Sequence, residues 1–184
     1  SPSAGYLIRK RVDPSAIPAS SSGTYKKRQG VLYRLAEAYL SYAESLYEYS
    51  VATGTYTDNE AEILDYINRV RYRAGIPQYG KGADQIPVTE AQLRDLIRRE
   101  RRVELNCEAG IRFDDLRRWK EAETALNGKF YGMNALAKNT ERNEYYKRTL
   151  YQTRRFISYW WPIPQDDIDK NTNLRQTPDW IAGN

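Results

Sequence analysis

The pattern of apolar and polar residues is strongest in residues 88–119, where apolar positions recur at the 3.6-residue spacing of a helix. Thr89 is followed three residues later by Gln92, which is the spacing of a capping box and marks a helix start. One apolar stripe continues through Leu93, Leu96, Ile97, Cys107 and Ile111. The pattern therefore predicts an amphipathic helix beginning near residue 89, with Cys107 as a small hydrophobic residue on its apolar face.

Two carboxylates, Glu100 and Glu104, fall in the middle of this stripe. An ionised carboxylate cannot be buried cheaply without a cation, so we expect arginines with bidentate geometry to face them. The expected partners are Arg69, Arg71 and Arg73 upstream, with Arg112, Arg117 and Arg118 downstream. The alternative is an acid–base or metal pair, but the chain has no histidine, the commonest general base and metal ligand. We therefore expect a buried ion-pair network, with no catalytic residues, cofactor or metal site.

An antiparallel helix pair is predicted for residues 31–75. Apolar residues recur at helical spacing over 31–51 and again over 63–74, with Gly54 in the turn between them. Thr57 and Glu60 have capping-box spacing at the start of the second helix, and Gly75 and Pro77 end it. Small alanines with tyrosines between them resemble a tetratricopeptide-type hairpin, of which one unit is visible. The polar positions of the first helix, assigned to its solvent face, are Arg34, Glu37, Ser41, Glu44 and Glu48.

The other segments differ in composition. Residues 1–30 are rich in Pro, Gly and Ser and predict an extended arm, and residues 76–88 predict a Gly/Pro loop. Helices are expected within residues 89–126, whereas residues 127–156 lack sustained periodicity and predict an irregular loop. Residues 157–184 predict a stiff Trp-Pro-Ile-Pro segment, a short helical turn and a polar tail. The fold class is therefore mainly α with long irregular loops.

Composition narrows the functional classes. The 29 Lys and Arg residues and 24 Asp and Glu residues are interspersed, which favours a salt-bridged surface over a nucleic-acid-binding face. Tyrosine supplies 16 of the 23 aromatic residues, a bias typical of half-buried helix faces or of a wet binding surface. Neither a signal peptide nor a membrane-spanning helix is expected here, so any targeting element would lie upstream.

Several motifs in order resemble one known family, the SusD/RagB outer-membrane nutrient-binding lipoproteins, in their C-terminal part. They are GY at 5–6, RK at 9–10, RLAEAYL at 34–40, YAE at 42–44, INRVR at 67–71, RAG at 73–75, ERRVEL at 100–105, GIRFDDLRRW at 110–119, WPIPQ at 161–165, Asn171 and QTPDW at 176–180. Cys107 and Thr177 depart from the residues expected in that family at those positions. The resemblance spans nearly the whole chain and implies a SusD-like fold.

The resemblance also implies a function. The full protein is expected to be surface-exposed and lipid-anchored in the outer membrane, with membrane contact only through an anchor upstream of this chain. It would capture a glycan or an oligopeptide without catalysis and hand it to a SusC-like TonB-dependent transporter. The alternative is a helical-repeat scaffold that binds a partner protein, and a nucleic-acid partner ranks last.

No binding residue follows from the matched motifs, because they are structural. Sugar capture requires exposed aromatic faces and planar hydrogen-bonding side chains, a combination that only the loops of this chain offer. The candidate ligand-binding residues are therefore Tyr79, Tyr131, Arg142, Asn143, Tyr145 and Tyr146. The identity of the ligand and the oligomeric state stay open at this point.

Overall fold

The structure is a computed structural model that describes residues 6, 8, 10, 12–15, 23, 30–108, 110–138, 140 and 142–181. Two compact units are present: residues 10–112 form one, and residues 1–9 with 113–184 form the other. Most of the expected arm at residues 1–30 lies outside the described residues.

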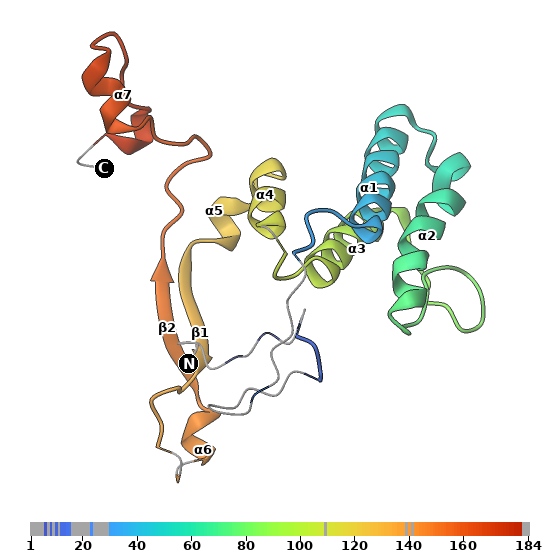
Figure 1. The fold of residues 1–184 in the computed structure, drawn as a ribbon. Helices are drawn as coiled ribbons and strands as arrows, with labels where there is room; N and C mark the ends of the chain where they lie inside the picture. The colour runs from blue at the N-terminus through green and yellow to red at the C-terminus, as the bar shows by residue number, and fades with distance from the viewer. Residues whose placement is uncertain are drawn as a thin grey trace. The chain divides into compact units, whose positions relative to one another are not determined.

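A helix pair opens the first unit. Helix α1 (Leu35–Thr53) and helix α2 (Tyr56–Arg73) are joined by two residues and pack side by side (Figure 1). Gly54 has a left-handed conformation with φ of 72° and donates its N–H to the carbonyl of Ser50, which ends α1. The predicted helix pair is thus present, although α1 begins four residues later than expected. The capping box predicted at Thr57 is wrong, because α2 begins at Tyr56 and Thr57 lies inside its first turn.

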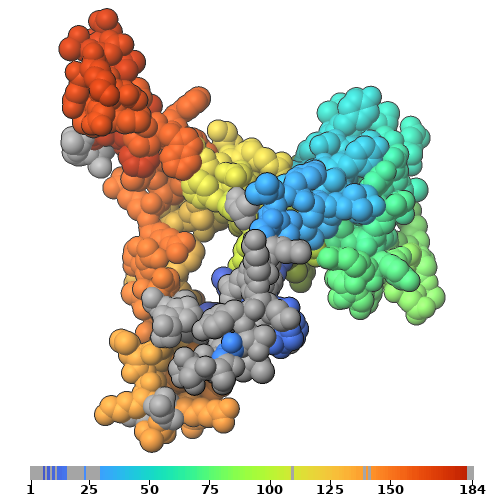
Figure 2. Space-filling model, viewed as in Figure 1, coloured from blue at the N-terminus to red at the C-terminus, as the bar shows by residue number. Residues whose placement is uncertain are grey.

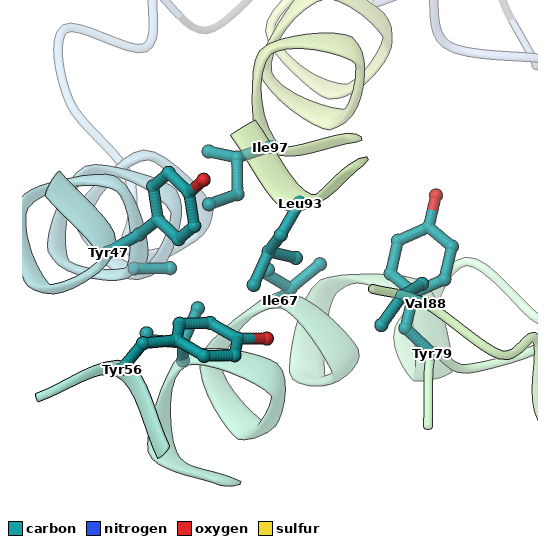
Figure 3. Packing of buried hydrophobic residues seen from close by; sticks show 9 residues of the cluster. Tyr47, Tyr56, Ile67, Tyr79, Val88, Leu93 and Ile97 are labelled. Atoms are coloured by element: carbon teal, nitrogen blue, oxygen red, sulfur yellow. The ribbon is translucent and has the colours of Figure 1, made fainter. Parts of the chain in front are cut away.

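Helix α3 (Glu90–Glu104) packs against both helices and completes the core of this unit. The predicted cap is present, since the Thr89 N–H donates to Oε1 of Gln92 at 3.2 Å. Leu93 and Ile97 point from α3 toward Ile67 of α2 and Tyr47 of α1 (Figure 3). Burial of each such aliphatic side chain contributes about 1.5–3 kcal/mol. The cluster consists of Ala43, Tyr47, Tyr56, Ile63, Ile67, Tyr79, Val88, Leu93 and Ile97.

The helix predicted from residue 89 ends earlier than its apolar stripe. Cys107 follows α3 in a turn with φ of 61°, and its side chain is exposed. The prediction of a buried cysteine on the helix face is therefore wrong, because the backbone has left the helix before that position. Gly110, with φ of 79°, precedes helix α4 (Ile111–Arg118), and a short helix α5 (Ala122–Ala125) follows.

The predicted irregular loop at residues 127–156 contains a β-hairpin instead. Strand β1 (Gly128–Met133) pairs antiparallel with strand β2 (Arg148–Arg154), and the short helix α6 (Arg142–Tyr145) lies in the connection (Figure 1). The register runs from Gly128 opposite Arg154 to Met133 opposite Arg148, with one irregularity after Phe130. All seven residues of β2 are exposed, so the strand has no apolar alternation to reveal it in the sequence.

The C-terminal segment is held by side-chain bonds to the backbone. Gln176 accepts the N–H of Ile163 at 2.9 Å and donates to its carbonyl at 2.8 Å, which fixes the extended Trp-Pro-Ile-Pro segment. The predicted helical turn is present as helix α7 (Gln165–Lys170). A 3-10 turn, η1 (Pro178–Trp180), follows, and Nε1 of Trp180 donates to the Trp160 carbonyl at 2.8 Å. Among the described residues, none of the helices has the length and apolar character needed to cross a membrane.

Candidate functional site

The innermost part of the predicted ion-pair network joins α3 to α2. Arg71 donates through Nη1 to Oε1 of Glu100, and both side chains are more than nine-tenths buried. Arg71 also donates from Nε to the Pro77 carbonyl at 2.7 Å, so its guanidinium has partners on two sides. A buried carboxylate is tolerated only when its charge is paired in this way. The prediction that Glu100 faces inward toward Arg71 matches this geometry.

Tyr79 belongs to the same cluster. Its hydroxyl donates to Oε1 of Glu100 at 3.1 Å, and the guanidinium carbon of Arg71 lies 3.9 Å from the centre of its ring. Burial raises the pKa of Tyr79, and the neighbouring Glu100 carboxylate raises it further. Tyr79 is therefore a hydrogen-bond donor in the core (Figure 3).

The backbone around Tyr79 explains why a Gly/Pro loop has a buried aromatic residue. The Asn68 side chain donates to the Tyr79 carbonyl and accepts its N–H, both at 2.8 Å, as a neighbouring strand would. Gly80 follows with φ of 154°, and a Cβ there would lie 2.1 Å from Oε1 of Gln85. Tyr79 is 4% exposed, so its prediction as a surface ligand-binding residue is wrong.

The outer part of the network surrounds Glu104. Arg34 and Arg73 both bind Oε1 of Glu104, and Arg34 also donates to the two carboxylate oxygens of Glu108 at 2.8 Å. Lys10 donates to the Glu104 carbonyl at 2.7 Å and pairs with Glu108. Burial alone would raise the pKa of Glu108, but the bonds from Arg34 and Lys10 outweigh it and hold the pKa below its ordinary value.

Of the other arginines in the prediction, Arg69 lies away from the network. Arg69 is half exposed, donates from Nε to Oδ2 of Asp65 at 2.9 Å and stacks on Tyr66. It is wrong as a partner of the inward glutamates, because it lies on the outer face of α2. Arg112 is half-buried in the first turn of α4, and its place in the network stays a prediction.

Sequence reasoning missed a second buried pair. Arg101 of α3 lies 3.4 Å from Oε2 of Glu44 and donates to Oγ of Ser41 at 2.9 Å. Glu44 and Arg101 are both buried, so the assignment of Glu44 to the solvent face of the first helix is wrong. The helical period places Glu44 only one turn from Leu40, and this proximity to the apolar stripe was the available signal.

The arginine–glutamate network holds helices together. Oε1 of Glu100, Oε1 of Glu104 and both carboxylate oxygens of Glu108 accept bonds from guanidinium groups. Within the described residues, no group of three or more His, Cys, Asp or Glu side chains is arranged to hold a metal ion.

The remaining ligand candidates lie together on the β-hairpin. Tyr131 is in β1, and Arg142 and Tyr145 bound the short helix α6. The rings of Tyr145 and Tyr146 meet edge to face with centroids 5.4 Å apart. The Asn134 N–H donates to the Tyr145 carbonyl at 3.0 Å and ties α6 to the end of β1. Arg142 and Asn143 are both exposed, so the structure brings all candidates except Tyr79 to this hairpin.

Comparison with known proteins identifies the family. The pattern of the SusD family matches residues 1–180 of this chain, which is nearly its whole length. The chain belongs to the SusD family. No curated protein sequence matches it.

Solved structures of SusD-like proteins resemble this chain. BT4246 is 33% identical over 96% of the chain with a TM-score of 0.74. A SusD-like carbohydrate-binding protein of Bacteroides fragilis, BF0978, is 35% identical over 79% of the chain with a TM-score of 0.58. A second SusD-like protein of that organism, BF3747, is 29% identical over 78% of the chain with a TM-score of 0.57.

Membership of the SusD family confirms the resemblance seen in the sequence and the mainly α, SusD-like fold class. The chain spans 29% of the length of BT4246 and 28% of BF0978. The described part of this SusD-family chain therefore corresponds to less than a third of each of these relatives.

Proposed function

We propose that this SusD-family chain is part of a non-catalytic protein that captures a glycan, or alternatively an oligopeptide, at the cell surface. The observation that carries the proposal is the 35% identity to a protein described as SusD-like and carbohydrate-binding. In this proposal the protein is associated with the outer membrane through a lipid anchor upstream of the chain. It hands its ligand to a SusC-like TonB-dependent transporter.

The two kinds of side-chain cluster support different roles, one in holding the fold together and one in binding the ligand. The arginine–glutamate network ties α2, α3 and the segments beside them into a rigid scaffold, because breaking a buried pair leaves an unpaired charge. The hairpin presents aromatic rings beside planar donors, the combination that sugar recognition uses. We therefore propose Tyr131, Arg142, Asn143, Tyr145 and Tyr146 as ligand-binding residues.

The experiment is calorimetric titration of the protein with a panel of oligosaccharides and oligopeptides. We expect a glycan to bind and Tyr146→Ala to weaken its affinity by about two- to tenfold, since loss of one aromatic contact costs about 0.5–1.5 kcal/mol. Tyr72→Ala is the matched control, because Tyr72 is also an exposed tyrosine but lies on α2, outside the hairpin. Failure of every glycan and peptide to bind would overturn the proposal.

The transporter step has its own test. Purification of the full protein from outer membranes should recover a SusC-like transporter in the same complex. Recovery of the protein in a fraction that lacks any outer-membrane transporter would contradict the proposed hand-over.

A second candidate function is a scaffold that binds a partner protein through the helix pair. It is favoured by the exposed apolar side chains Leu35, Tyr49 and Tyr72 on α1 and α2. Exposed apolar surface of this kind often marks an interaction site. This alternative predicts the opposite result for the same two variants: Tyr72→Ala would lower binding of a partner protein, and Tyr146→Ala would leave it unchanged.

A further inference from the structure

The hairpin, defined here as residues 128–155, has an excess of positive charge. These residues include seven of the 29 Lys and Arg residues but only two of the 24 Asp and Glu residues. They therefore have a formal charge of +5, which equals the charge of the whole chain. The remaining residues contain 22 of each kind and are neutral. That neutrality is a sum over unequal segments, since residues 1–30 also have a formal charge of +5 and the other residues outside the hairpin have −5.

The cations of the hairpin are displayed to solvent. All seven of its Lys and Arg side chains are exposed: Lys129, Lys138, Arg142, Lys147, Arg148, Arg154 and Arg155. In the first unit, by contrast, Arg71 and Arg101 are buried against carboxylates. Pairing with carboxylates accounts for the buried cations Arg71 and Arg101, whereas the exposed hairpin has an excess of cations that can attract an anion. Figure 2 shows the strands of the hairpin, in orange, with their side chains at the surface.

Arg148 is the best-positioned of these cations. Its guanidinium carbon lies 3.7 Å from the centre of the Tyr131 ring, close enough for a cation–π contact. Arg148 pairs in register with Met133, and Tyr131 lies two residues earlier on β1, so Arg148 and Tyr131 share one face of the hairpin. No carboxylate among the described residues forms an ion pair with Arg148. A stacked guanidinium is already oriented and keeps its N–H groups for a carboxylate or sulfate.

A pocket lies at the same end of the hairpin. It has a volume of about 400 Å³ and is lined by residues of both strands and of the connection, among them Met133, Asn134, Leu136, Thr149 and Tyr151. Met133 is the register partner of Arg148, and Thr149, the next residue on β2, lines the pocket, so Arg148 adjoins the pocket in the strand pairing. An amide, a hydroxyl and an aromatic ring beside apolar side chains suit a sugar ring, and a pocket of this size is typical of small-ligand sites.

Resting on the proposed function, we propose that the hairpin selects anionic saccharides, with Arg148 binding their carboxylate or sulfate group. Tyr131 holds the Arg148 guanidinium, and the adjoining pocket takes the sugar ring. The other exposed cations of the hairpin attract further acidic residues of the same glycan by long-range electrostatics. A neutral glycan would leave this concentration of charge unused.

The test compares saccharides that differ only in charge. The probes are an oligogalacturonate with its fully methyl-esterified form, and chondroitin sulfate with desulfated chondroitin. Each is titrated calorimetrically into the full protein at low and at high NaCl. We expect the more acidic member of at least one pair to bind about tenfold more tightly, because a charge-assisted hydrogen bond is lost in the other. High salt should reduce that difference.

Two variants locate the site. Arg148→Gln should weaken the affinity for the acidic saccharide by about tenfold. Arg102→Gln should leave the affinity unchanged, because Arg102 is an exposed arginine at the end of α3, outside the hairpin. Circular dichroism and thermal melting of both variants establish that they are folded, which separates loss of the site from loss of the fold.

The outcomes separate this inference from the proposed function. Equal binding of both members of each pair, or binding only of a neutral glycan from the wider panel, would overturn anion selection and leave glycan capture standing. Equal effects of Arg148→Gln and Arg102→Gln would overturn the placement on the hairpin. Binding to phosphatidylglycerol vesicles without binding to any saccharide would overturn both proposals and identify the hairpin as a membrane-contacting element.

Discussion

The helices of the first unit and the hairpin of the second use arginine in opposite ways. In the helices, Arg71 is buried against Glu100 and stacks on Tyr79, so its charge stabilises the fold. In the hairpin, Arg148 stacks on Tyr131 and is exposed to solvent. A guanidinium stacked on a tyrosine ring stabilises the fold where a carboxylate also binds it, as Glu100 binds Arg71. Where none of the described carboxylates binds it, as at Arg148, the guanidinium can take part in ligand recognition.

The largest effect should come from breaking the buried pair. Glu100→Ala leaves Arg71 as an unpaired buried charge and should lower the free energy of unfolding by about 3–5 kcal/mol. Urea denaturation measures this change. Asp95→Ala is the control, since Asp95 is exposed on the same helix and should change stability by less than about 0.5 kcal/mol. Equal effects of the two substitutions would show that the Glu100 pair is not part of the stabilising core.

A smaller effect should appear at acidic pH. The bonds from Arg34 and Lys10 keep the pKa of Glu108 below its ordinary value of 4.5, despite the opposing effect of burial. A carboxylate with a lower pKa in the folded state adds stability above its unfolded pKa and loses it as pH falls through the folded pKa.

Glu108→Gln should therefore flatten the fall in unfolding free energy below about pH 4.5 and lower stability near neutral pH. Urea denaturation at a series of pH values measures the slope. Glu123→Gln, on the exposed face of α5, should keep the wild-type slope. A slope for Glu108→Gln identical to wild type would contradict the assigned pKa.

Tyr79→Phe should cost about 1 kcal/mol, because it removes the hydroxyl that donates to Glu100 and keeps the ring in the core. Thermal or urea denaturation measures the loss. Glycan affinity should not change, since Tyr79 is buried. If Tyr79→Phe kept full stability and bound glycan more weakly, the result would contradict this account and indicate that Tyr79 binds the ligand.

The smallest effect on stability should come from the hairpin. Tyr146 is 59% exposed, so Tyr146→Ala should change the free energy of unfolding by less than about 0.5 kcal/mol. Its effect should appear in the calorimetric affinity for glycan instead. A loss of stability as large as that of Tyr79→Phe would mean that the hairpin tyrosines serve packing.

The helices of the first unit and the hairpin also differ in how far the sequence predicts them. The three long helices follow from their apolar periodicity, and Glu100 was expected to face an arginine because a lone buried carboxylate is costly. Arg34 and Glu44 were misassigned to solvent, because each lies at the border of the apolar stripe, where the helical period alone does not decide burial. Arg34 and Glu44 found partners from α3 and the turn after it, a long-range match that local pattern does not contain.

The strands of the hairpin and the burial of Tyr79 were not predicted from the sequence, for related reasons. A strand exposed on both faces has no alternation, and the glycines of β1 have weak strand propensity. Tyr79 is buried because Asn68 brackets its backbone, an interaction between residues eleven apart that no turn signal marks. The resemblance to the SusD family supplied the fold class that periodicity alone could not, but it indicated no ligand-binding residues.

Hydrogen–deuterium exchange in the presence of the tightest-binding saccharide tests the division between scaffold and recognition surface most directly. The account predicts slower exchange in residues 128–155 when the glycan is bound, with exchange in α1, α2 and α3 unchanged. Slower exchange confined to α1 and α2, with none in the hairpin, would contradict it.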